Sequence, residues 1–144
     1  MTNRTSVLLV DDSPIFLHIL TRFLHEYSQG EVVVVGTADG GERALVRARE
    51  LRPDIVLIDL AMPDLPGLEA IPRLRQALPE MGIIAVTMLG PNGYRKAALA
   101  AGADEFVSKT TLSIDLPPAL RRVARARASG QAPRAQCSPV DEDE

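Results

Sequence analysis

Cysteine is almost absent from this sequence. Cys137 is the single cysteine among 144 residues, so the chain has no internal disulfide and no cysteine-based metal knuckle. A chain with one thiol is typical of a reducing compartment.

Long hydrophobic runs are also missing. No uncharged apolar stretch approaches the roughly 18 to 20 residues that a helix needs to cross a bilayer. The first apolar segment is interrupted by Asp11 and Asp12, which a secretory signal peptide would not tolerate. We therefore expect a cytoplasmic protein without a membrane span.

Most of the chain has no excess of positive or negative charge. The formal net charge is −3 at pH 7, and residues 129–144, with one arginine and four acids, account for it. Residues 1–128 hold 15 basic and 15 acidic side chains. A balanced body offers no overall field for a polyanion, although Arg121, Arg122, Arg125 and Arg127 cluster locally. We therefore expect no direct contact with nucleic acid.

What the sequence does have is a regular alternation of short apolar runs and helical patterns. The expected strands are 7–10, 31–37, 54–59, 82–87 and 105–108. Three expected helices span 14–27, 94–101 and 115–128. Of the other two, one follows 39–42 and ends near 51, and the next has apolar residues at 68, 71, 74 and 78. This alternation predicts an α/β fold, a three-layer sandwich with a five-stranded parallel sheet and five helices.

Several helix starts carry local signals. Ser13 followed by Pro14 predicts an N-cap with proline in the first helical position. Residues 39–42, Asp-Gly-Gly-Glu, resemble a capping box for the second helix. Asp115 is expected to cap the last helix, with the prolines at 117–118 in its first turn.

The chain divides into one compact domain and a tail. Residues 129–144 are rich in Ser, Gly, Gln, Pro, Ala and acids and show no apolar periodicity. We therefore expect a domain over 1–128 and a disordered acidic tail over 129–144.

Five polar residues follow or end predicted strands. Asp11 and Asp12 follow the first strand, Asp59 ends the third, Thr87 ends the fourth, and Lys109 follows the fifth. Ligand sites of parallel α/β sheets lie at the carboxyl ends of the strands, so these side chains are expected to converge on one edge.

Three carboxylates at one edge repel one another unless a cation lies between them. Magnesium is the natural occupant, because it prefers oxygen ligands and usually takes one or two carboxylates together with waters and phosphate oxygens. With such a cation and the Lys109 ammonium nearby, one carboxylate is able to receive a phosphoryl group, and the Thr87 hydroxyl can bond one of its oxygens.

Over residues 5–128 the chain resembles a CheY-like receiver domain of the response-regulator family. The resemblance rests on an acidic pair, a five-residue stretch with a glycine eight positions past its aspartate, a threonine ending one strand, an aromatic residue in the next, and a lysine. These are Asp11-Asp12, Asp59-Leu-Ala-Met-Pro63 with Gly67, Thr87, Phe106 and Lys109. The order and strand positions of these fragments together are specific to the family. The resemblance implies the flavodoxin-like strand order 2-1-3-4-5 for the sheet.

The resemblance assigns roles to these residues. Asp59 is expected to be the phosphoacceptor and to bind magnesium directly with Asp12 and the backbone carbonyl of Ala61, while Asp11 holds a metal-bound water.

Two further residues, Thr87 and Phe106, are expected to form a switch pair. In the family the hydroxyl moves toward the phosphoryl group and the aromatic ring turns inward. This movement remodels the surface of the fourth helix, fifth strand and fifth helix.

The sequence departs from the family pattern in two places. Thr110 follows Lys109 where a proline with a cis bond is usual, and a non-proline cis bond costs about 2.5 to 4 kcal/mol. Met88 follows Thr87 where many receivers have a small residue, so it is expected to shield part of the phosphoryl pocket.

The leading functional hypothesis is a stand-alone signalling switch rather than an enzyme, acting as a monomer or a phosphorylation-dependent dimer. Its expected partners are a histidine kinase or phosphotransfer protein and a downstream protein target. The first alternative is a haloacid-dehalogenase-like phosphatase, which needs a second aspartate where Ala61 stands. The other is a pseudo-receiver that binds partners without phosphorylation, against which the complete acidic set argues.

Overall fold

The computed structural model describes residues 4–88 and 93–128. The strands are β1 (Thr5–Val10), β2 (Val32–Ala38), β3 (Ile55–Ile58), β4 (Gly82–Thr87) and β5 (Glu105–Ser108). The helices are α1 (Pro14–Ser28), α2 (Gly41–Leu51), α3 (Gly67–Ala77), α4 (Tyr94–Ala101) and α5 (Leu112–Ala128), with the 3-10 turn η1 (Lys109–Thr111) before α5. All strand pairs are parallel and the order is β2-β1-β3-β4-β5, which confirms the predicted fold class.

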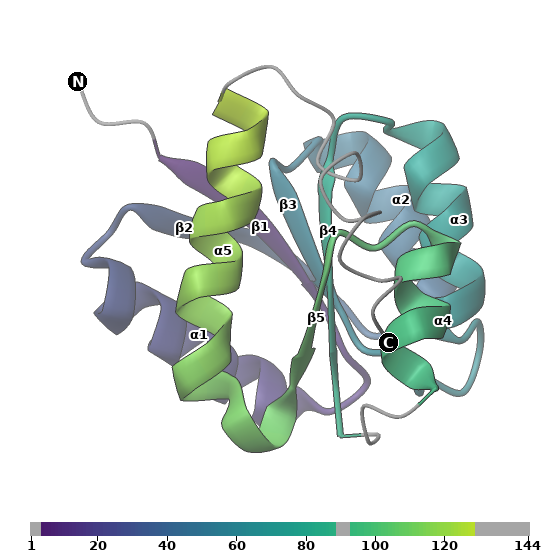
Figure 1. Ribbon diagram of the computed structural model, residues 1–144, viewed down its shortest axis with the longest axis horizontal. Coiled ribbons are helices and arrows are strands. Elements are labelled where there is room, and N and C mark those ends of the chain that lie inside the picture. The colour runs from purple at the N-terminus through teal and green to yellow at the C-terminus, as the bar shows by residue number, and fades with distance from the viewer. Residues whose placement is uncertain (1–3, 89–92, 129–144) are drawn as a thin grey trace.

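The sheet lies between α1 and α5 on one side and α2, α3 and α4 on the other (Figure 1). Each face of the sheet carries a hydrophobic core. One core joins the sheet to α2, α3 and α4, and the other joins it to α1 and α5. The four residues of β3 are all buried and alternate between the two cores, with Val56 and Ile58 in the first and Ile55 and Leu57 in the second. A strand buried on both faces has no polar side, which explains its continuous apolar sequence.

The start of α1 follows the sequence prediction. The Ser13 hydroxyl accepts a hydrogen bond from the Phe16 backbone N–H at 3.2 Å, and Pro14 is the first helical residue. The capping residue therefore satisfies one of the amide groups that the first turn leaves without a partner.

The capping box predicted at 39–42 is wrong. Gly40 is the N-cap of α2, and no side chain next to it in the sequence caps the helix. The carboxylate of Asp64 instead accepts hydrogen bonds from the backbone N–H groups of Gly41 at 3.1 Å and Glu42 at 3.3 Å. The cap thus comes from the loop after β3, where a local sequence pattern could not indicate it.

The last helix also begins earlier than expected. α5 starts at Leu112, so Asp115 lies within its first turn, where it accepts a hydrogen bond from the Thr111 hydroxyl at 2.6 Å. The reason is η1, whose N-cap Ser108 accepts from the Thr110 N–H and leads directly into the helix. The prolines at 117–118 consequently lie beyond the first turn.

No helix within 4–88 and 93–128 combines the length and hydropathy needed to span a bilayer. The tail predicted at 129–144 lies outside the described residues.

Candidate functional site

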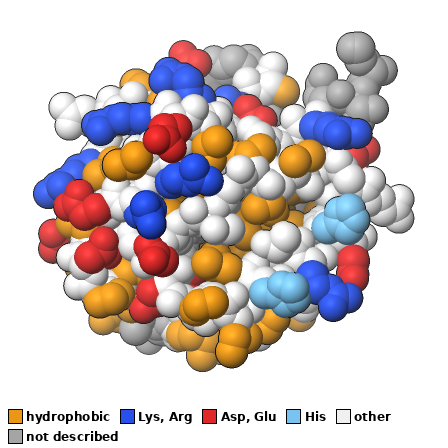
Figure 2. Space-filling view, turned by 180° about the vertical axis from the view of Figure 1, so that it is seen from behind, with side chains coloured by type: hydrophobic (Ala, Val, Ile, Leu, Met, Phe, Trp, Pro, Cys, Tyr) orange, Lys and Arg blue, Asp and Glu red, His pale blue; other side chains and the backbone are white. Residues whose placement is uncertain are grey.

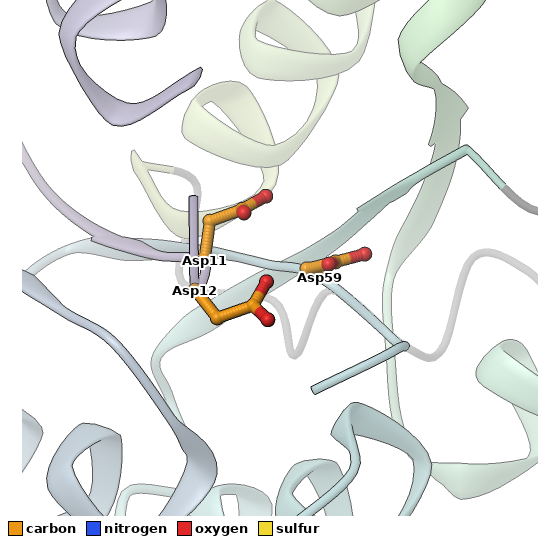
Figure 3. A group of neighbouring side chains, drawn as sticks. All are labelled: Asp11, Asp12 and Asp59. Atoms are coloured by element: carbon orange, nitrogen blue, oxygen red, sulfur yellow. The ribbon is translucent and has the colours of Figure 1, made fainter. Parts of the chain in front are cut away.

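The carboxyl ends of four strands bring the predicted site residues together. Asp11 and Asp12 follow β1, and Asp59 follows β3. Thr87 is the last residue of β4, and Lys109 comes directly after β5. Figure 3 shows the three aspartate side chains gathered at this edge of the sheet.

The three aspartates form a compact group of oxygen ligands. One carboxylate oxygen from each lies within 4.8 Å of the others. Asp11 and Asp59 are buried, with exposed fractions of 2% and 5%, whereas Asp12 is exposed. The group thus has two buried carboxylates and one that faces solvent, where a hydrated cation can enter.

Lys109 supplies positive charge to the buried carboxylates. Its Nζ lies 2.6 Å from Asp11 Oδ2 and 3.8 Å from Asp59 Oδ2, and its side chain is 11% exposed. A single ammonium group next to three carboxylates leaves the site negative, which favours a second cation.

The surroundings of Asp59 act on its pKa in opposite directions. Burial raises the pKa of the Asp59 carboxyl group, and the neighbouring charge of Asp11 raises it further. The Lys109 ammonium lowers the pKa, as do hydrogen bonds from the Ala61 backbone and the Thr87 hydroxyl, but burial dominates and the net shift is upward.

The loop after Asp59 packs closely against α3. The Gly67 N–H donates to the Leu60 carbonyl at 3.0 Å, and a Cβ at Gly67 would collide with the Asp59 carbonyl oxygen. Only glycine permits this approach, which accounts for glycine at position 67. Ala61, in the same loop, is exposed.

The two proposed switch residues lie on neighbouring strands. Thr87 is fully buried, and Phe106 is 9% exposed within the core beneath α4, where it is paired in register with Ala85 of β4. The inward ring is the position that the family resemblance associates with the phosphorylated state.

The two departures from the family pattern have small structural effects. None of the described peptide bonds is cis, so Lys109 reaches the carboxylates through a trans bond to Thr110. Met88 is 63% exposed and therefore does not pack into the site as a shield.

One site neighbour was missed by the sequence analysis. The ring of Phe16 lies with its centroid 4.1 Å from Lys109 Nζ. Phe16 lies within the helix predicted at 14–27, and no local pattern connects it to a lysine 93 positions later.

The donor set fits magnesium. The oxygens of Asp11, Asp12 and Asp59 are hard ligands that lie close enough together to share one ion, and Asp12 opens to solvent for the waters that magnesium retains.

Comparisons with known proteins point to one family. Residues 7–121 match the model of the response regulator receiver domain. The response regulator protein VraR of Staphylococcus aureus is 34% identical over 119 residues, which cover 83% of this chain and 56% of VraR. The chain thus spans about half the length of the curated relatives it matches.

Solved structures agree. A two-component response regulator of the LuxR family from Aurantimonas sp. SI85-9A1 has a TM-score of 0.79 and 29% identity, with 98% of this chain and 99% of that one covered. RcsB from Salmonella enterica serovar Typhimurium, bound to the promoter rprA, has a TM-score of 0.76 and 27% identity, with 85% and 61% covered.

These relatives overturn the expectation of no direct contact with nucleic acid. RcsB is seen bound to a promoter, and the match leaves 39% of that chain outside it. The charge balance of residues 1–128 describes only the surface of the receiver, so it carries no information about how a response regulator with a DNA-binding domain contacts DNA.

Proposed function

This chain belongs to the response-regulator receiver domain family, and on that premise we propose that it is a phosphorylation-dependent switch of a two-component phosphorelay. The observation that carries the proposal is the buried Asp59 carboxylate, which lies beside two further carboxylates, the Lys109 ammonium and the Thr87 hydroxyl. The donor in this proposal is the phosphohistidine of a kinase or phosphotransfer protein.

In the proposed transfer, one carboxylate oxygen of Asp59 forms a bond to phosphorus. The bond between phosphorus and the imidazole nitrogen breaks, its electron pair stays on that nitrogen, and the imidazole takes up a proton. Lys109 is placed to attract the phosphoryl oxygens because its Nζ already lies 3.8 Å from Asp59. Positioning and charge neutralisation dominate such transfers, and in this proposal Lys109, the Thr87 hydroxyl and the bound cation supply them.

The metal has a defined place in this proposal. Asp12, Asp59 and the Ala61 carbonyl would hold magnesium directly, with Asp11 bound to one of its waters. When bound, the ion supplies positive charge that neutralises the transferring phosphoryl group.

The response in this proposal passes from Thr87 to Phe106. A phosphoryl oxygen on Asp59 accepts a hydrogen bond from the Thr87 hydroxyl, and this holds the Phe106 ring inward beneath α4. The altered face of α4, β5 and α5 then changes the affinity for a protein target, which includes the case of a DNA-binding domain.

The family is not one of classical enzymes, and a specific feature disfavours the phosphatase alternative. Ala61 occupies the position two residues after Asp59 where a haloacid-dehalogenase-like phosphatase needs an acid. A methyl group cannot transfer a proton to a leaving group.

Intact-mass measurement after incubation with a small acyl phosphate and magnesium tests the proposal. We expect one phosphoryl group on the wild type and none on Asp59→Asn, because an amide oxygen is a poor nucleophile. Glu80→Gln, at an exposed acid that precedes β4 at the opposite edge of the sheet, is the control and should be phosphorylated like the wild type. A phosphoryl group on Asp59→Asn would contradict the assignment.

A further inference from the structure

We propose that Phe16 is a positioning residue for Lys109, which its aromatic ring holds at the distance from Asp59 that phosphoryl transfer requires. The functional half of this inference rests on the proposed function, whereas the contact itself does not.

The Lys109 ammonium has neighbours on three sides. Asp11 Oδ2 lies at 2.6 Å, Asp59 Oδ2 at 3.8 Å, and the centroid of the Phe16 ring at 4.1 Å. The face of an aromatic ring carries the negative part of its quadrupole and attracts a cation at this distance. With only 11% of the Lys109 side chain exposed, little water competes for the ammonium.

The ring is tied to the same aspartate that the lysine binds. Asp11 Oδ1 accepts from the Ser13 N–H at 2.9 Å, and the Ser13 hydroxyl accepts from the Phe16 N–H at 3.2 Å. The Phe16 ring then contacts Lys109 Nζ, which returns to Asp11 Oδ2. These contacts link Asp11, Ser13, Phe16 and Lys109 in a ring. They fix the position of the aromatic ring relative to Asp11 and restrict the movement of the ammonium.

Asp11 and Asp59 compete for the Lys109 ammonium, and the Phe16 ring limits that competition. Lys109 is 1.2 Å closer to Asp11 than to Asp59, so without a third contact the ammonium is free to turn around Asp11 and away from the phosphoacceptor. The Phe16 ring, with its centroid 4.1 Å from Nζ, adds a third attraction that opposes this rotation. Because Phe16 also packs against the core of α1 and α5, its effect on Lys109 must be separated from packing.

A double-mutant cycle makes this separation. Phe16→Leu keeps an apolar side chain but removes the ring, and we expect it to slow phosphorylation of Asp59 by a small acyl phosphate roughly threefold to tenfold. In a Lys109→Ala background the same substitution should have no further effect. A loss of packing alone would slow both backgrounds equally, and that result would overturn the inference.

Two matched variants complete the kinetic test. Phe16→Tyr keeps a ring and should retain the wild-type rate. Phe23→Leu makes the same chemical change on the same helix and should also retain the rate. Phe23 packs against the same core and stacks on Tyr27, with ring centroids 6.0 Å apart. Equal slowing by Phe16→Leu and Phe23→Leu would contradict the proposal.

The contact can be observed without phosphorylation. The chain has two lysines, Lys96 and Lys109, so protein labelled with ¹³C-lysine gives two sets of side-chain signals. In magnesium-free protein we expect the ring to shift the Lys109 methylene protons upfield of those of exposed Lys96, and Phe16→Leu to abolish the difference. Unchanged Lys109 signals in Phe16→Leu would overturn the contact.

The two measurements distinguish the possible failures. A wild type that takes no phosphoryl group on Asp59 contradicts the proposed function and with it the catalytic half of this inference, while the NMR signals still decide the contact. A phosphorylated wild type with no coupling between Phe16 and Lys109 contradicts this inference alone.

Discussion

Asp59 carries a charge that its surroundings compensate only in part. Its carboxyl group is buried, and burial together with the charge of Asp11 raises its pKa despite Lys109 at 3.8 Å. Stability that comes from such a group is fully present below the pKa of the unfolded chain and is lost as pH rises through the folded pKa. At a pH above the pKa of the unfolded chain, Asp59 therefore destabilises the metal-free protein.

Replacement of Asp59 by asparagine should consequently raise the thermal unfolding midpoint in divalent-free buffer at pH 7. The gain should disappear as pH is lowered below the ordinary carboxyl pKa of about 3.9, where the wild type is neutral at this position. Magnesium should raise the midpoint of the wild type more than that of Asp59→Asn. Scanning calorimetry over a pH series checks this, and a lower midpoint for Asp59→Asn at pH 7 would refute it.

The N-terminus of α2 depends on a side chain from another element. Asp64 lies in the loop between β3 and α3, and its carboxylate accepts from the Gly41 and Glu42 N–H groups. Hydrogen bonds from the backbone of Leu65, Gly41 and Glu42 lower the pKa of Asp64. The same contact holds the loop that follows Asp59 against α2.

Asp64→Ala should therefore lower stability. A carboxyl group with a lowered folded pKa contributes stability above its unfolded pKa and loses it as pH falls through the folded pKa. The difference in unfolding midpoint between wild type and Asp64→Ala should accordingly be largest near neutral pH and shrink in acid. Asp39→Ala, at the start of the incorrectly predicted capping box, is the control and should have a smaller effect.

Arg75 joins α3 to the turn before β5. Its guanidinium donates to the Gly102 carbonyl at 2.8 Å and to Asp104 Oδ2 at 2.8 Å, and Asp104 Oδ2 also accepts from the Ile83 N–H. The side chains of Arg75 and Asp104 are 14% and 2% exposed, so this ion pair is largely removed from water.

Arg75→Met should be strongly destabilising, since removal of one partner of a buried ion pair costs about 3 to 5 kcal/mol. Arg73→Met on the same helix removes a half-exposed arginine whose ion pair with Glu42 spans 3.9 Å, and should change stability by less than about 1 kcal/mol. Urea unfolding of both variants measures the difference. Similar free energies of unfolding would show that the Arg75 network contributes little.

Across the whole molecule, charge is mixed rather than gathered. The face in Figure 2 carries basic, acidic and hydrophobic side chains interspersed. The acids of residues 129–144 account for the net charge of −3, so removing this segment leaves a neutral chain. The segment has no apolar periodicity, so its sequence gives no indication that it packs against the domain.

Truncation after Ala128 should therefore leave the thermal unfolding midpoint unchanged. The comparison is made at two salt concentrations, because acids held by the arginines of α5 would be released by salt. A marked drop in the midpoint at low salt alone would show electrostatic docking of 129–144. A drop at both salt concentrations would show that the segment packs on the domain.

Local patterns in the sequence determined the order of strands and helices along the chain and much of the site. The alternation of apolar runs with helical spacing indicated the parallel sheet, and the parallel sheet in turn placed Asp11, Asp59 and Lys109 at one edge. The N-cap at Ser13 was predictable for the same reason, because its partner, Phe16, is three residues away.

Only the tertiary structure decided which distant groups meet. Asp64 caps a helix that begins 23 residues earlier, and Phe16 contacts Lys109 from the opposite end of the chain. Side-chain patterns act over the few residues of a turn or a helical repeat, whereas these contacts depend on how packed elements bring remote segments within hydrogen-bonding distance. The sequence therefore placed Phe16 in a helix, whereas only the packing of that helix beside η1 set its ring against the ammonium of Lys109.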